Sequence, residues 1–140
     1  MNAFVFSLLL LAAPAGGPVL VVTGSGVAPL PVAAGKGTVK ILLEQATGAP
    51  VSLSEMVLQP GAVVPEHAHE GAAEILYVVD GALDVTSGGK TTRAAAGDAV
   101  HVPPGVKHQA VVPPGKPVRL VQVYSPPGPE QRFRPAAAPR

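Results

Sequence analysis

Glycine and proline break this chain into short pieces, and that punctuation is the strongest constraint on its fold. The 140 residues include 16 glycines and 17 prolines, and most of the prolines fall outside the apolar runs. No segment keeps a helical repeat of apolar residues long enough to form an extended helix. Short apolar runs bounded by turn residues are typical of β-strands joined by tight turns. The sequence therefore predicts an all-β fold of short antiparallel strands.

The expected strands are apolar or alternating runs that begin and end at turn residues. They cover residues 39–45, 51–59, 74–79, 82–86, 91–94, 99–102, 108–112 and 118–124. The sequence Ser-Gly-Gly-Lys at 87–90 predicts a hairpin turn between two of them. A chain of this length forms one domain that is large enough to bury a core.

Composition argues against several classes of partner. Charged residues make up 14% of the chain and the net charge is +1, so nothing indicates a nucleic-acid surface or a polybasic membrane patch. Aromatic residues make up 4% and tryptophan is absent, which argues against base stacking. The chain has no cysteine, and disulfides and thiolate ligands are therefore ruled out.

Three histidines and one glutamate carry the concentrated chemistry of the chain. His67 and His69 are two residues apart, so on a strand their side chains share a face. Glu74 would fall on the opposite face of one continuous strand. We therefore expect a turn or bulge at Gly71 that places Glu74 on the same side as the two histidines. With His108, these residues offer nitrogen and carboxylate ligands. Such a set suits a divalent transition metal, and iron, manganese, nickel, copper and zinc all remain candidates.

The stretch around the first two histidines resembles the first signature motif of the cupin superfamily. That motif reads G, five residues, H-x-H, four residues, E, six residues, G. Every position is matched in this chain, by Gly61, His67, His69, Glu74 and Gly81.

A second stretch resembles the other cupin motif, which reads G, five residues, P-x-G, two residues, H, three residues, N. Gly97, Pro103, Gly105 and His108 match it, and Val112 replaces the final Asn. In the family that Asn is not a metal ligand and is often replaced, so the departure leaves the ligand set intact. Both motifs at family spacing in one short chain form a specific signal.

The resemblance implies a small single-domain cupin, folded as a jelly-roll barrel of short antiparallel strands over residues 39–124. It also implies that four residues hold the metal: His67, His69, Glu74 and His108. Similarity to flavonol-cleaving cupins gives Glu74 a second role as a catalytic base. Small cupins commonly form homodimers, which cover exposed sheet edges, so we expect a homodimer.

The expected function is that of a small metal-dependent oxygenase acting on a small organic substrate by Lewis-acid activation. Four protein ligands on an octahedral ion leave two adjacent positions, which can take a substrate alone or together with dioxygen. An isomerase or lyase would use the same metal without oxygen. A phosphosugar substrate would need clustered cations, whereas Lys40, Arg93 and Arg119 show no clustering. A third alternative is a non-catalytic cupin module that binds a ligand or a metal, because fold alone does not decide function.

The two ends of the chain differ from the barrel in composition. Residues 1–15 have an apolar centre followed by Ala-Pro-Ala and resemble a signal peptide that lacks an early basic residue. That pattern favours a periplasmic or secreted protein; a hydrophobic first strand or a mis-assigned start would leave it cytoplasmic. The run is too short for stable membrane insertion. Residues 16–38 predict a linker or edge strand, and residues 125–140 predict a Pro-rich tail that frays unless Phe133 packs against the barrel.

Two further side chains have less specific expectations. His101, the fourth histidine, lies on the expected strand before Pro103 and either lines the pocket or points to solvent. We expect the side chain of His101 to point to solvent. Tyr77 lies in the apolar run after Glu74 and is expected in the core.

Overall fold

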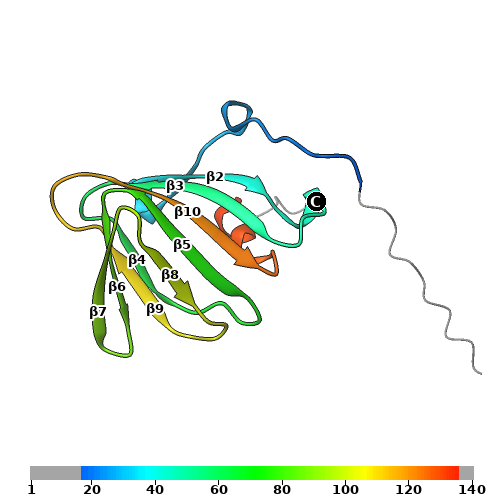
Figure 1. Cartoon of the computed structure of the whole chain (residues 1–140). Helices are drawn as coiled ribbons and strands as arrows, with labels where there is room; N and C mark the ends of the chain where they lie inside the picture. The colour runs from blue at the N-terminus through cyan, green and yellow to red at the C-terminus, as the bar shows by residue number, and fades with distance from the viewer. Residues whose placement is uncertain (1–16, 136–140) are drawn as a thin grey trace, which may run out of the picture.

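The computed structural model describes residues 17–135, which form ten β-strands in two sheets (Figure 1). The strands are β1 (Leu30–Val32), β2 (Gly37–Leu43), β3 (Ser52–Leu58), β4 (Val63–His67), β5 (Ala73–Asp80), β6 (Ala82–Ser87), β7 (Lys90–Ala95), β8 (Ala99–Val102), β9 (His108–Val111) and β10 (Val118–Ser125). Short 3-10 helices are η1 (Gly24–Gly26), η2 (Ala33–Gly35), η3 (Gln45–Thr47) and η4 (Pro129–Phe133). None of these described helices is long and apolar enough to cross a membrane. The expected signal peptide, residues 1–15, lies outside the described residues.

The two sheets face one another in a jelly-roll arrangement. The larger sheet has the order β1-β2-β3-β10-β5-β8 and the smaller has the order β4-β9-β6-β7, with antiparallel neighbours throughout. Figure 1 shows β2, β3, β10 and β5 as one layer above β4, β6, β7 and β9. Within residues 17–135 no ladder of hydrogen bonds joins the two sheets, so they do not close into a continuous barrel. The all-β jelly-roll expectation is confirmed.

Alternation along the strands separates the core from the surface. On β10, Val118, Leu120 and Tyr124 are buried between the sheets, whereas Arg119 is exposed and Val121 is half-buried. Burying a side chain such as Leu120 contributes roughly 1.5–3 kcal/mol to folding. The core cluster takes residues from both sheets: Val39, Met56, Leu58, Ala62, Leu76, Val78, Leu83, Ala94, Ala110, Val112, Val118 and Leu120.

Two strands, β1 and β4, lie outside the residue ranges in which the sequence predicted strands. β1 lies within the stretch expected to be a linker or edge strand, and it forms the outer edge of the larger sheet. β4 ends at His67, so His69 lies two residues beyond the strand rather than on it. The expectation that both histidines share one strand therefore does not hold, although their side chains still meet.

The C-terminal segment is more ordered than expected. β10 extends to Ser125, and η4 follows it as a red coil drawn between β2 and β10 (Figure 1). Glu130 on η4 is fully buried and accepts a hydrogen bond from the backbone N–H of Gly128 at 2.6 Å. Phe133 packs against the core cluster. Packing, rather than local sequence, fixes this segment.

Candidate metal site

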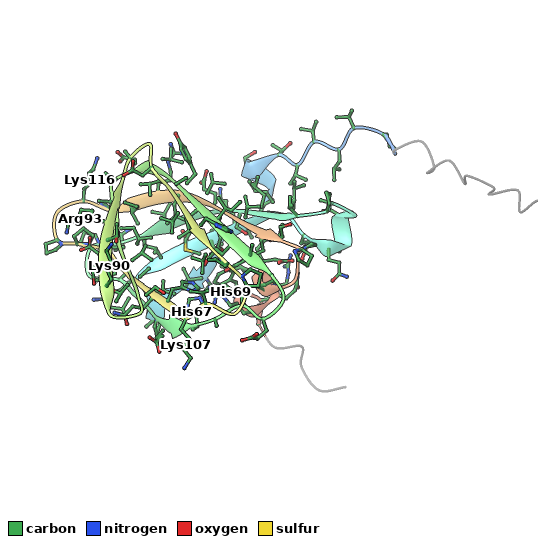
Figure 2. All side chains as sticks on the ribbon, turned by 60° about the horizontal axis from the view of Figure 1, so that its bottom comes forward. His67, His69, Lys90, Arg93, Lys107 and Lys116 are labelled. Atoms are coloured by element: carbon green, nitrogen blue, oxygen red, sulfur yellow. The ribbon has the colours of Figure 1, made fainter. Side chains whose placement is uncertain are left out.

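The four expected ligands come from both sheets and meet at one end of the space between them. His67 is the last residue of β4 and lies directly opposite His108, the first residue of β9. Glu74 projects from β5 of the larger sheet and is buried. The chain reaches β5 through a turn at Gly71, whose φ of 78° is the left-handed conformation that glycine adopts easily. His69 lies between the two strands, and Figure 2 shows it beside His67.

Distances between the ligand atoms fit a single metal ion. The Nε2 atoms of His67 and His69 are 3.2 Å apart, and Nε2 of His108 lies 2.9 Å from Oε2 of Glu74. Oε2 of Glu74 is 3.5 Å from Nε2 of His69, and one ligand atom from each residue lies within 4.8 Å of all the others. Adjacent ligands at metal–nitrogen distances of 2.0–2.1 Å would be about 3 Å apart around an octahedral ion. The side chains are therefore spaced as metal ligands are.

Backbone carbonyls fix which ring nitrogen faces the centre. Nδ1 of His67 donates to the carbonyl of Pro65 at 2.7 Å, and Nδ1 of His108 donates to the carbonyl of Val106 at 3.0 Å. A carbonyl only accepts, so the proton of a neutral ring lies on Nδ1 and the lone pair lies on Nε2. Such outer hydrogen bonds orient histidine ligands in metal sites.

Two of the four central atoms, Oε2 of Glu74 and Nε2 of His108, lack hydrogen-bond partners. The amide nitrogen of Gln122 donates to Oε1 of Glu74, which leaves Oε2 directed at the histidines. Oε2 of Glu74 and Nε2 of His108 are buried and, despite their 2.9 Å separation, do not meet in the direction of a hydrogen bond. Buried polar atoms normally have a partner. A cation between these lone pairs would supply one, so the residues fit a metal.

Without an ion, the ligands shift one another's pKa values. Burial would raise the pKa of Glu74, but contacts with His108 and His69 and the bond from Gln122 outweigh burial and hold this pKa far below its usual range. Contact with the Glu74 carboxylate raises the pKa of His108, against the effect of burial. Burial lowers the pKa of His67. Glu74 is therefore an anion at neutral pH, as a metal ligand must be.

Tyr124 is a neighbour of the site that the sequence did not indicate. It lies opposite Glu74 in the ladder between β10 and β5, and its ring meets that of His69 edge-on with centroids 4.7 Å apart. Burial, together with the nearby charge of Glu74, raises the pKa of its phenol. The hydroxyl has no hydrogen-bond partner among the described residues. Nothing in the local sequence could have revealed this contact, because strand register creates it.

An apolar cavity of about 280 Å³ leads from the ligands into the space between the sheets. Its walls include Met56, Leu58, Leu76, Leu83, Ala110 and Leu120. His67, Glu74, His108 and Gln122 form its polar end, and Arg132 and Phe133 line it from η4. A mostly apolar cavity with a few converging polar groups is typical of a small-molecule site.

Two other side chains lie away from the cavity. His101 on β8 is exposed and lines another groove, between the edge strands β7 and β8, which also reaches His108. Tyr77, expected in the core, is 48% exposed on the outer face of the larger sheet. It faces outward because the buried position Glu74 is an odd number of residues away along β5.

Comparison with known proteins identifies the family. A family model of the cupin domain matches residues 54–124, and the chain therefore belongs to the cupin superfamily. Auxin-binding protein ABP19a from Prunus persica is 36% identical over 89 residues, which make up 59% of this chain and 42% of that protein. The chain spans less than half the length of the curated relatives it matches.

Solved structures agree on the fold. KdgF from Halomonas sp. has a TM-score of 0.68 at 25% identity, covering 79% of this chain and 97% of that one. The polyketide cyclase RemF from Streptomyces resistomycificus has the same TM-score and identity, covering 80% of this chain and 82% of that one. The protein is thus a small cupin with a His/Glu group that could hold a metal.

Proposed function

We propose that this protein binds one divalent transition metal and acts as a small oxygenase on a small organic substrate. The observation that carries the metal is the set of converging lone pairs: buried Oε2 of Glu74 and Nε2 of His108, with Nε2 of His67 and His69 beside them. Iron, manganese, nickel, copper and zinc all accept this donor set. When bound, the metal would supply Lewis acidity and, if redox-active, electron transfer to dioxygen.

The protein's own residues would orient the substrate and exclude water. His67, Glu74 and His108 line the cavity, so a ligand entering it meets the metal-binding atoms directly. Its aliphatic walls would displace water around the reacting group, which strengthens electrostatic interactions there. Gln122 would hold Glu74 in position through Oε1.

A base role for Glu74 stays a prediction. The pKa of this carboxyl is held well below its usual range by the surrounding donors, and a strongly depressed pKa makes a weak base. Glu74 would become a better base if it moved away from the metal and from its contacts with His69 and His108. The ligand role therefore has the firmer support.

Non-oxidative Lewis-acid chemistry is the second candidate. It is supported by the likeness to RemF, which is described as a polyketide cyclase. Phosphosugar chemistry has less support, because Arg132 is the one Lys or Arg side chain that lines the cavity among the described residues, whereas Arg93 pairs with Asp84 and Lys116 with Asp80. Figure 2 shows Lys90, Arg93 and Lys116 well away from His67 and His69. A non-catalytic binding module is the remaining alternative.

Elemental analysis of untagged protein, followed by oxygen uptake, tests the proposal. We expect close to one equivalent of metal in the wild-type protein and almost none in a His67→Ala, His69→Ala double variant. His101→Ala is the matched control, because its ring is exposed and outside the cavity, and it should keep the metal. Substrate-dependent oxygen uptake by the iron-loaded protein would support the oxygenase. Turnover without oxygen uptake would favour the second candidate, and failure to bind any metal after reconstitution would refute both.

A further inference from the structure

Arg132 differs from the other arginines of the described chain in having no acidic partner. Arg93 pairs with Asp84, Arg119 with Glu55 and Arg134 with Glu44. Arg132 makes no ion pair within residues 17–135, although its side chain lines the apolar cavity. A guanidinium is a donor built for planar anions such as carboxylates.

The short helix η4 is fixed to the body of the protein around this residue. Glu130 is fully buried, and Glu44 accepts hydrogen bonds from both Gln131 and Arg134. Phe133 packs against the core, and the guanidinium carbon of Arg132 lies 4.7 Å from the centre of its ring. Stacking of this kind restrains a guanidinium while leaving its edge free to donate hydrogen bonds. The exposed side chain of Arg132 is therefore restrained by Phe133 before any ligand arrives.

Charge is distributed unevenly along the cavity. The walls are aliphatic, the inner end carries the His/Glu group, and Arg132 and Glu66 are the charged residues outside that group. Glu66 is exposed and makes no ion pair with Arg132 among the described contacts. The volume of about 280 Å³ lies just below the range of about 300–1,000 Å³ that is typical of ligand sites. A ligand that uses all of these features is small and apolar in its body, and it carries an anionic group.

We propose that Arg132 is the substrate-recognising residue of this cavity and that the substrate is a small organic carboxylate with a short aliphatic or aromatic body. The carboxylate binds the guanidinium, the body lies against the aliphatic walls, and the opposite end of the molecule reaches the His/Glu group. This assignment of substrate class rests on the proposed function for what happens at the inner end. The recognition step itself needs only the cavity and Arg132.

Calorimetric titration with benzoate and hexanoate, each beside its neutral amide, tests the proposal. The titrations use the full chain, once treated with a chelator and once loaded with zinc. We expect Arg132→Gln to weaken binding of both acids at least fivefold and to leave the amides unchanged, because only the charged group loses its partner. Arg132→Lys should retain part of the effect through its charge. Arg119→Gln, a surface change on the outer face of the larger sheet, should alter nothing.

Unchanged acid binding in Arg132→Gln would overturn the proposal, and so would equal loss of acid and amide, which would mean that the cavity had been distorted. Failure of both acids to bind the wild-type protein would overturn it as well. Metal content is measured on the same samples. If no variant holds metal, the proposed function fails, while the acid-against-amide comparison on chelator-treated protein still decides the role of Arg132.

Discussion

The side-chain amide of Gln122 on β10 donates a hydrogen bond to Oε1 of Glu74 on the neighbouring strand β5. Both side chains are buried, so water does not compete for this bond. It occupies one carboxylate oxygen and leaves Oε2 directed at His69 and His108. A residue that is not a ligand thus determines which oxygen of Glu74 is available to a metal.

Replacing Gln122 with leucine should weaken metal binding without removing a ligand. Loss of an outer hydrogen bond to a metal ligand typically lowers affinity 10–100-fold, because the carboxylate is no longer held in one orientation. Competition with a chromophoric zinc chelator measures the change. Gln59→Leu, at an exposed position outside the cavity, is the control and should bind zinc normally. Equal affinities of Gln122→Leu and wild type would show that the bond does not orient Glu74.

The pair of Glu74 and His108 should make the stability of the metal-free protein depend on pH. The pKa of His108 is raised, so its contribution is complete below the usual 6.5 and is lost as pH rises through the raised value. The pKa of Glu74 is lowered, so its contribution is complete above the usual 4.5 and is lost as pH falls. Both contributions are complete between these limits.

Urea unfolding of chelator-treated wild type and Glu74→Gln at pH 5.5 and pH 8.5 checks this window. The stabilisation by Glu74 should be larger at pH 5.5 and should fall towards pH 8.5, because His108 gives up its proton as the pH rises through its raised pKa and the buried carboxylate then loses its charged partner. His67, whose pKa is lowered by burial, is present in both proteins and largely cancels in the difference. A difference that is the same at both pH values would contradict the pairing.

The sequence could predict most strands because their apolar runs end at glycine or proline turns. The sequence did not predict β4, because Pro65 interrupts the run from Val63 to His67. Proline is tolerated there because β4 is an edge strand of the smaller sheet, where a missing N–H breaks no ladder. The edge position of a strand is a property of the assembled sheet, so it cannot be predicted from the local sequence.

The candidate ligands could be found from spacing alone, whereas their surroundings could not. The motif places His67, His69, Glu74 and His108 by number, and the structure brings all four together. Arg132 reaches the cavity because η4 is fixed by buried Glu130, by Phe133 and by Glu44, which lies 90 residues before Arg134 in the chain. A contact of that range has no local signature, so the sequence predicts a tail that frays unless Phe133 packs against the barrel, and Phe133 does pack there.

Self-association, expected from the sequence, should depend on the outer face of the larger sheet. Ile75 and Tyr77 on β5 are 42% and 48% exposed, and half-buried Val121 and Val123 lie beside them on β10. A two-fold dimer uses the same patch on both copies, so one substitution places two charges in the interface. Tyr77→Glu should therefore convert a dimer into a monomer in light scattering after size exclusion. Thr92→Glu, on exposed β7, should leave the mass unchanged, and a monomeric wild type would refute the homodimer.

Gly81 and Gly89 both adopt left-handed backbone conformations but differ in their surroundings. Their φ angles are 84° and 78°. A Cβ on Gly81 would lie 2.5 Å from the carbonyl oxygen of Pro117, whereas a Cβ on Gly89 would meet nothing within 4 Å. Gly89→Ala should cost roughly 1–2 kcal/mol for the conformation alone. Gly81→Ala should cost clearly more, because the backbone around Pro117 must also move. Urea unfolding of the two variants measures the difference, and equal losses would mean that the motif glycine is required only for its φ angle.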